Sequence, residues 1–436
     1  MKRLLKGGRL VDPANGRDGA FDILIDGDRI AKVGRDLTVE SGTTVVEIPK
    51  GFIVCPGLID IHVHLREPGQ EHKETVATGV AAAVAGGFTA VACMPNTTPV
   101  NDNAGVTEYM LKKTAEANLA RVYPIGAVSR GQKGEQLADI AELKNAGCVA
   151  ITDDGRPVAT ALLMRRALEY ASMFNIPVIE HCEEQSLKGD GVAHEGFQAS
   201  SLGLRGIPGE AESIMALRDI SLSSLTGGAV HIAHMSARQT LEAVRFGKSQ
   251  GARVTCEVTP HHFVLTDEML AQPIAYDTNT KMNPPLRETA DRDAMLGGLA
   301  DGSIDVIATD HAPHAADEKQ VEFDHAPFGI TGLETAVSLC FDRLIHTGVV
   351  TLPRLIELLS VNPARIINVA GGSLSEGAPA DITILAPDLA VTVVAAKMKS
   401  KSKNTPFDGW QLRGGVAATI VGGRVVYVNE SAHLVI

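Results

Sequence analysis

The pattern of hydrophobic and polar positions differs between the two ends of the chain and its middle. Residues 21–33 alternate apolar and polar side chains and break at Asp26-Gly27, which is typical of a β-hairpin. Residues 380–385 form another strand-like stretch, and residues 417–428 repeat the hairpin pattern with a turn at Gly422-Gly423. We expect these pieces to form one small β-sandwich domain, built from residues 1–51 and 376–436.

The middle of the chain, residues 52–375, alternates short apolar runs with helical patterns. The helical period is clear over 159–175, 210–225 and 237–250. Eight runs are typical of buried parallel strands: residues 53–63, 89–94, 120–128, 148–152, 177–180, 229–233, 253–258 and 304–308. Eight such alternations predict an α/β protein with a (β/α)8 TIM-like barrel. A doubly wound open sheet is the alternative, but it usually carries a glycine-rich loop after its first strand, where this chain has His62-Val63-His64.

Composition narrows the classes of function. Lys and Arg number 40 against 52 Asp and Glu, and aromatic residues make up 4%, so we expect no nucleic-acid or membrane surface. The six cysteines are scattered without a CxxC pair, as in a reduced cytoplasmic protein. The apolar stretch near the N-terminus is too short for a signal peptide, and no run approaches the roughly 18 residues of a membrane span. We therefore expect a soluble, cytoplasmic protein.

Polar side chains stand at the ends of the predicted strands, where barrel enzymes place their sites. His62 and His64 end the first strand and, as positions i and i+2, share one of its faces. Later strands end in Asp153-Asp154, His181, His234 and Asp310. A lone buried histidine is usually a packing residue, but packing would not choose the same strand end each time. Imidazoles and carboxylates in this number suit Zn2+, so the pattern predicts a metal centre.

The remaining histidines have weaker support as ligands. His231 lies three residues before His234 and should face the other side of its strand, in a packing or outer hydrogen-bonding role. His261 and His262 follow the seventh strand and suit hydrogen bonding behind the ligands better than ligation. Five others lack supporting context and are expected in loops or at the surface: His72, His194, His325, His346 and His433.

Cationic and amide side chains gather near the same strand ends, namely Arg66, Asn96, Asn283 and His314. An arginine can hold a carboxylate through two parallel hydrogen bonds. A surface ion pair is the alternative for Arg66, but its place two residues after His64 favours substrate binding. The polar loop at residues 315–328 is equally compatible with a mobile cover over the site and with an ordinary surface loop.

Together these segments resemble the dihydroorotases of the bacterial class I type, within the amidohydrolase superfamily. The resemblance runs through residues 56–75, 92–99, 152–155, 180–184, 231–237, 257–262, 281–287, 308–314 and 326–336, and so covers nearly the whole chain. The HxH motif alone marks only the superfamily. The combination of HLREPG, MPNT, TDDG and PFGITGLET is specific to this family.

The resemblance implies a zinc enzyme that reversibly cyclises N-carbamoyl-L-aspartate to L-dihydroorotate in de novo pyrimidine biosynthesis. It implies the metal ligands His62, His64, Asp154, His181, His234 and Asp310, with one or two zinc ions and Asp154 able to bridge them. Asp310 also matches the catalytic aspartate, and the substrate-binding groups match Arg66, Asn96, Asn283 and His314. The family suggests a homodimer and leaves an association with aspartate transcarbamoylase open.

Two related classes of protein are the alternatives. Hydantoinases and dihydropyrimidinases bridge their metals with a carboxylated lysine at the end of the fourth strand, where this chain has Asp153-Asp154; the nearest lysine, Lys144, precedes the strand. A ring substrate without a carboxylate would also not need Arg66. Inactive partners of aspartate transcarbamoylase have degraded metal ligands, whereas this chain keeps all six.

Overall fold

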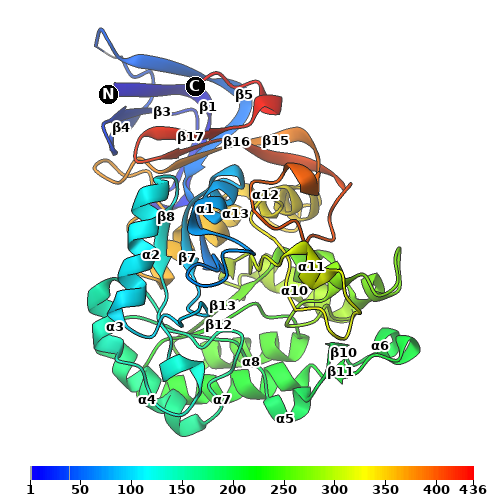
Figure 1. The fold of residues 1–436 in the computed structure, drawn as a ribbon. Helices are drawn as coiled ribbons and strands as arrows, with labels where there is room; N and C mark the ends of the chain where they lie inside the picture. Colours follow the sequence, from blue (N-terminus) through cyan, green and yellow to red (C-terminus); the bar gives the residue numbers. More distant parts are fainter. Residues whose placement is uncertain (1, 39) are drawn as a thin grey trace.

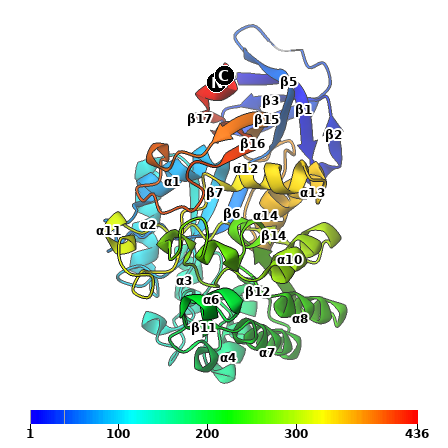
Figure 2. The same cartoon turned by 90° about the vertical axis from the view of Figure 1, so that its right-hand side faces the viewer.

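The computed structural model describes residues 2–38 and 40–436, and its centre is a closed barrel of parallel strands (Figure 1, Figure 2). The named barrel strands are β6 (Leu58–Val63), β7 (Phe88–Cys93), β8 (Arg121–Pro124), β9 (Val178–Glu180), β12 (Val230–Ile232), β13 (Val254–Val258) and β14 (Val306–Ile307). Ile151 supplies the remaining position, because it bridges in parallel to Gly126 on one side and Val178 on the other. A parallel bridge between Val63 and His311 closes the ring.

Helices cover the outside of the barrel. The first four are α1 (Val76–Ala85), α2 (Ala104–Ala117), α3 (Ile140–Ala146) and α4 (Ala161–Ser172). A longer insertion follows β9 and holds α5 (Gln185–Lys188), β10 (Ala193–His194), α6 (Phe197–Leu202), β11 (Gly206–Ile207) and α7 (Glu210–Thr226). The later helices are α8 (Arg238–Ser249), α9 (Pro260–Val264), α10 (Thr289–Asp301), α11 (Ala316–Lys319), α12 (Ala336–Cys340), α13 (Leu352–Ile356) and α14 (Asn362–Ile366). Helices α1 and α4 begin where the Thr75 and Thr160 hydroxyls accept a backbone N–H of the first turn.

The two chain ends form the predicted second domain. Its strands are β1 (Lys2–Asp12), β2 (Arg17–Gly19), β3 (Asp22–Asp26), β4 (Arg29–Gly34), β5 (Thr44–Pro56), β15 (Ile382–Thr392), β16 (Gln411–Val421) and β17 (Arg424–Val428). Hydrogen bonds connect them in the order β17-β16-β15-β5-β1-β3-β4, with β2 beside β1. Both predicted hairpins are present, as β3–β4 and β16–β17. The barrel and the β-sandwich domain confirm the predicted fold class; we propose the division near residues 51 and 376 as their boundary.

The predicted strand at residues 53–63 is wrong in one respect, because it is two strands. Residues up to Pro56 belong to β5, which pairs with β1 and β15 of the small domain. From Leu58 the chain belongs to β6 and pairs with β7 of the barrel. A Cβ on the intervening Gly57 would lie 2.2 Å from Thr89 Oγ1, so only glycine permits this close passage. The apolar pattern does not reveal the change, because both strands are buried at the junction.

Apolar side chains fill the interior of the barrel and leave the carboxyl ends of its strands to polar groups. Ile59, Ile61, Ala90, Ala92 and Met94 belong to this inner cluster. All six cysteines are free and buried, as expected for a reduced protein. Within the described ranges, none of the helices combines the length and apolar character that crossing a membrane requires.

Candidate active site

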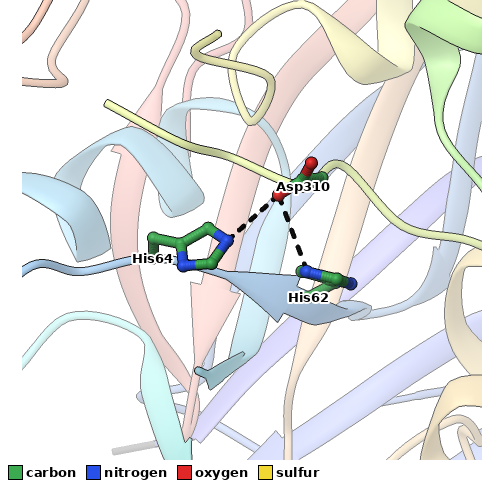
Figure 3. A group of neighbouring side chains, drawn as sticks. All are labelled: His62, His64 and Asp310. Atoms are coloured by element: carbon green, nitrogen blue, oxygen red, sulfur yellow. Dashed lines mark hydrogen bonds and ion pairs between the residues drawn. The ribbon is translucent and has the colours of Figure 1, made fainter. Parts of the chain in front are cut away.

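The end of β6 brings two imidazoles to one carboxylate, as Figure 3 shows. His64 Nε2 lies 3.1 Å and His62 Nε2 lies 3.6 Å from Asp310 Oδ1. The register of β6 against β7 shifts between Asp60 and Val63, and such irregularities re-aim side chains beside active sites. All three side chains are buried, so the cluster is shielded from bulk water.

Asp154 stands between this pair and two further histidines. Its Oδ2 lies 3.4 Å from His64 Nε2, while its Oδ1 lies 3.4 Å from His62 Nε2. The same Oδ1 lies 3.5 Å from His234 Nε2 and 3.8 Å from His181 Nδ1. The structure thus brings together all six side chains for which the sequence predicts metal binding, with the two oxygens of one carboxylate facing different histidines.

The donor set fits a metal ion. Two ligands that each lie about 2.0–2.1 Å from a tetrahedral zinc are about 3.3 Å apart, close to the spacings above. Two donor groups are compact enough for this: His62, His64 and Asp310, and His62, Asp154 and His234. His62 Nε2 and Asp154 Oδ1 are buried and make no hydrogen bond to any described residue. Buried polar atoms are normally satisfied, so these two atoms fit the ligands of a cation.

Neighbouring side chains orient the histidines from behind. Glu257 Oε1 lies 2.6 Å from His62 Nδ1, and Asn96 Oδ1 lies 2.9 Å from His64 Nδ1. A bound metal ion would keep the proton on each Nδ1 and take the lone pair of each Nε2. His231 Nε2 lies 3.1 Å from Glu257 Oε2, which confirms the predicted outer role of His231. His262 also acts outside the cluster, because its Nε2 lies 2.9 Å from the Pro284 carbonyl oxygen.

The carboxylates of the cluster are held in their charged form. Burial opposes the charge on Asp310, but the hydrogen bond from His64 and the charge of His62 bring the pKa of Asp310 below its ordinary value. Burial likewise opposes charge on Asp154, yet His62 and His234 hold the pKa of that carboxyl well below 3.8. Both groups are therefore carboxylates at neutral pH, as metal binding and proton acceptance require.

Three site residues have an unusual backbone conformation. The φ angles of Arg66, His234 and Asp310 are +61°, +29° and +47°. Residues with a Cβ atom rarely adopt positive φ. Where they do, the surrounding fold must hold this strained backbone conformation, and such residues cluster at active sites. The backbone conformation therefore marks the same three strand ends as the side-chain chemistry.

A pocket of about 330 Å³ opens above the cluster. The four predicted substrate-binding residues all line it: Arg66, Asn96, Asn283 and His314. Arg66 Nε donates to the Pro313 carbonyl at 3.2 Å, and its Nη2 lies 3.3 Å from His314 Nε2. Asn283 Nδ2 lies 3.3 Å from His181 Nε2. The pocket volume is that of a small-molecule site.

The loop at residues 315–328 borders this pocket. Pro327 and Phe328, at the C-terminal end of the loop, line the pocket wall. Two lysines hold the loop. Lys319 Nζ donates to the carbonyls of Thr278 at 3.0 Å and Pro327 at 2.8 Å, and Lys281 Nζ donates to Phe323 O at 2.7 Å. These bonds fix the loop beside the pocket, and its role as a mobile cover stays a prediction.

Sequence reasoning missed two residues of the site. Glu257 was not singled out, although a carboxylate inside the buried run of β13 needs a partner and so gives a detectable signal. Lys188 also lines the pocket, and its Nζ lies 3.0 Å from Glu183 Oε2. Lys188 sits in a loop-rich insertion that offers no periodic pattern, so its sequence context gave no such signal.

His194 does not lie at the surface, so that prediction is wrong. The residue is 8% exposed, and Arg287 Nη1 lies 3.0 Å from its Nδ1. Burial and the charge of Arg287 lower the pKa of His194 to about 4. The sequence around His194 does not reveal its burial, because its partner Arg287 comes from a distant part of the chain. His72, His325, His346 and His433 are exposed, as expected.

The low pKa of His194 predicts a loss of stability in acid. The unfolded chain binds a proton at His194 below pH 6.5, whereas the folded protein resists doing so down to about pH 4. Between pH 7 and pH 4, the free energy of unfolding of the wild type should fall by about 2–3 kcal/mol more than that of His194→Gln. Thermal unfolding midpoints across this range measure the difference, with His72→Gln as an exposed control. Parallel curves for wild type and His194→Gln would refute the assignment.

Comparison with known proteins adds sequence similarity to this geometry. Residues 51–240 match a family model described as dihydro-orotase-like, and residues 225–427 match the amidohydrolase family model. The dihydroorotase of Syntrophotalea carbinolica is 51% identical over 427 residues, which cover 98% of this chain and 99% of that protein. The dihydroorotase of Pelotomaculum thermopropionicum is 52% identical over 426 residues, which cover 98% of each protein.

Solved structures share the fold. The L-hydantoinase of Arthrobacter aurescens is 23% identical with a TM-score of 0.86, covering 98% of this chain and 96% of that one. The dihydropyrimidinase of Brevibacillus agri is 22% identical with a TM-score of 0.85, covering 99% of this chain and 96% of that one. At this level of identity, the likeness establishes the barrel with its β-sandwich domain and leaves the choice of substrate to the site.

Proposed function

The chain belongs to the dihydroorotase family, and from this premise we propose that it is a zinc-dependent dihydroorotase that interconverts N-carbamoyl-L-aspartate and L-dihydroorotate in pyrimidine biosynthesis. The observation that carries the proposal is the pairing of a cluster of four histidines and two aspartates with Arg66 in one pocket. The cluster suits hydrolysis of a cyclic amide, and the arginine suits a substrate that keeps a free carboxylate.

We propose that one or two zinc ions occupy the cluster. His62, His64 and Asp310 would hold one ion and His181 and His234 the other, with Asp154 between them. Neutral imidazoles and carboxylates are zinc ligands of the kind found in hydrolytic enzymes. When bound, zinc lowers the pKa of water to about 7 and polarises a neighbouring carbonyl group.

Asp310 is proposed as the group that moves the proton. In the hydrolytic direction its carboxylate takes a proton from the attacking water and gives it to the ring nitrogen as the bond from that nitrogen to the carbonyl carbon breaks. In the cyclising direction it takes a proton from the carbamoyl nitrogen as that nitrogen attacks the side-chain carboxyl carbon of the aspartate portion. It then returns the proton to the hydroxyl group, which leaves as water when the carbon–oxygen bond breaks. The low pKa of Asp310 keeps the group ionised at neutral pH, and only the ionised carboxylate has a free site for a proton.

Arg66, Asn96 and His314 are proposed to hold the free carboxylate of the substrate, with Asn283 beside His181 at the reacting end. Pro313 O fixes the Arg66 guanidinium from one side, which leaves part of its fork for the ligand. Binding the carboxylate orients the ring and so removes much of the entropic part of the barrier.

Arg66→Ala is expected to lower kcat/KM for dihydroorotate by about 10- to 150-fold, mainly through KM, because a charged hydrogen bond contributes about 1.5–3 kcal/mol. Turnover of dihydrouracil, the same ring without the carboxylate, should not change. Steady-state kinetics with both substrates measure the split. Arg130→Ala, which changes an exposed arginine, serves as the control. Unchanged kinetic constants for dihydroorotate in Arg66→Ala would contradict the proposal that Arg66 holds the substrate carboxylate.

One assay tests the function as a whole. Zinc-loaded protein should hydrolyse dihydroorotate and cyclise N-carbamoyl-L-aspartate, and it should prefer dihydroorotate to dihydrouracil and hydantoin. Asp154 stands where hydantoin-cleaving relatives have a carboxylated lysine, which supports this preference. Absence of turnover at full zinc occupancy, or equal rates on the uncharged rings, would contradict the proposal.

We also propose a cytoplasmic homodimer. The six free thiols support the location. Helices α4, α7 and α8 lie side by side (Figure 1). Their exposed apolar side chains support the dimer: Leu162, Ile214, Leu217, Leu225 and Phe246. Light scattering of wild type and Leu225→Glu tests it, since the charge should shift the mass to that of a monomer. An association with aspartate transcarbamoylase rests on the resemblance alone and is tested by co-elution.

A further inference from the structure

A segment of the small domain reaches the barrel beside the pocket. Between β15 and β16 the chain leaves the sheet and descends past α12 toward α11 (Figure 1, Figure 2). Its residues 398–405, called the strap below, are anchored by two carboxylates. Glu334 accepts the backbone N–H groups of Lys399 and Ser400, at 2.8 and 3.0 Å. Glu74, which is fully buried, accepts the N–H of Lys401 at 3.0 Å and the Ser400 hydroxyl.

The strap places one buried side chain, Asn404, which is 6% exposed. Its Oδ1 accepts the backbone N–H of His314 at 3.0 Å. Its Nδ2 donates to the carbonyls of Ala312 and Gly329, each at 3.1 Å. The backbone carbonyl of Asn404 accepts the N–H of Thr331 at 2.9 Å. One acceptor and two donors of a carboxamide are thus all used, a combination that no carboxylate or hydroxyl can supply.

The groups bound by Asn404 belong to two segments that form one wall of the pocket. Residues 310–314 follow β14, and residues 328–331 run beside them, with the Ala312 N–H donating to Ile330 O at 2.8 Å. Ala312, His314, Phe328 and Gly329 face the pocket from this wall. Asn404 lies behind the wall, so it acts on the site only through the residues it holds.

His314 is the residue on which this support converges. Its N–H is bound by Asn404, its Nε2 lies 2.9 Å from Phe328 O, and the same nitrogen lies 3.3 Å from Arg66 Nη2. A shift of the His314 backbone would therefore move the imidazole relative to the guanidinium. Small misplacements of groups that orient a substrate have large kinetic effects.

We propose that Asn404 is a positioning residue that sets the carboxylate end of the substrate site through His314, which makes the small domain part of the active-site architecture. This inference rests on the proposed function, because it assigns the His314 side to the substrate carboxylate. Among the described residues, the Asn404 side chain forms hydrogen bonds only to this wall, so its loss is expected to disturb substrate binding more than the rest of the fold.

The test uses Asn404→Asp in the zinc-loaded full-length protein. The carboxylate has nearly the same shape, keeps the acceptor for the His314 N–H, and places an oxygen against two carbonyl oxygens. We expect kcat/KM for dihydroorotate to fall by about 10- to 100-fold, mostly through KM, with zinc content near that of wild type. The thermal midpoint should fall as well, because buried oxygen atoms face one another. Asn404→Ala is the second variant if the aspartate fails to fold. Lys399→Ala is the control, because it removes an exposed strap side chain and keeps the backbone bonds.

A double variant separates positioning from stability. If Asn404 acts through His314, the variant His314→Ala with Asn404→Asp should be no worse than His314→Ala alone, whereas independent effects would multiply. Multiplied losses, or unchanged kinetics in Asn404→Asp and Asn404→Ala, would overturn the inference. A wild-type protein that does not turn over dihydroorotate would instead overturn the proposed function.

Discussion

Asp310→Asn is expected to lower kcat by about 10²- to 10⁴-fold, the range that general acid–base catalysis supplies. The amide has the shape of the carboxylate but cannot take a proton from water and pass it to the ring nitrogen. The five other donors, His62, His64, Asp154, His181 and His234, remain in place, so zinc content should stay near that of wild type. Stopped-flow or steady-state kinetics of dihydroorotate hydrolysis measure kcat, and metal analysis measures the zinc content.

The control for this variant is Asp317→Asn, which removes an exposed carboxylate of α11 seven positions along the chain. It should leave kcat unchanged. Near-wild-type turnover in Asp310→Asn at full zinc occupancy would remove the proton-transfer role. A loss of zinc in step with activity would leave Asp310 as a ligand only.

Removal of the metal is the second large effect. Chelation should reduce turnover to background, and added Zn2+ should restore it, because the donor atoms of the cluster stay in place around the site. Zinc at about 1,000 times its dissociation constant should raise the free energy of unfolding by about 4 kcal/mol. Activity, bound metal per chain and the unfolding midpoint are followed together during zinc titration.

The matched variant for metal removal is His234→Gln. It deletes one donor next to Asp154 and should reduce zinc content and zinc-dependent stabilisation in the same measurements. Activity that persists in the fully chelated protein would contradict a metal-dependent reaction.

The sequence predicted the barrel and its cluster well, for a physical reason. Parallel strands end at one rim, so polar residues at the ends of separate apolar runs must meet there. His62 lies near the end of β6, and His181 and Asp310 come after β9 and β14. In the structure His62 contacts Asp310, and Asp154 contacts both His62 and His181. The alternation of apolar runs and helical segments along the chain therefore contains most of the information needed to locate the site.

Contacts from outside the strand ends could not be predicted in this way. Asn404 reaches the site from the other domain, and Arg287 reaches His194 across many residues of sequence. Such tertiary hydrogen bonds have no period along the chain. The division of residues 53–63 into two strands escaped for a related reason, because a change of partner strand leaves an apolar run unchanged.

The central position of β5 imposes an order on biosynthesis. One edge of β5 pairs with β1 at once, but its other edge waits for β15, which the ribosome makes only after the whole barrel. During that interval the nascent chain carries an unpaired, apolar strand edge, the kind of surface that chaperones cover and that aggregates when left open. The small domain, although it contains the N-terminal strands, is thus completed only after the barrel has been made.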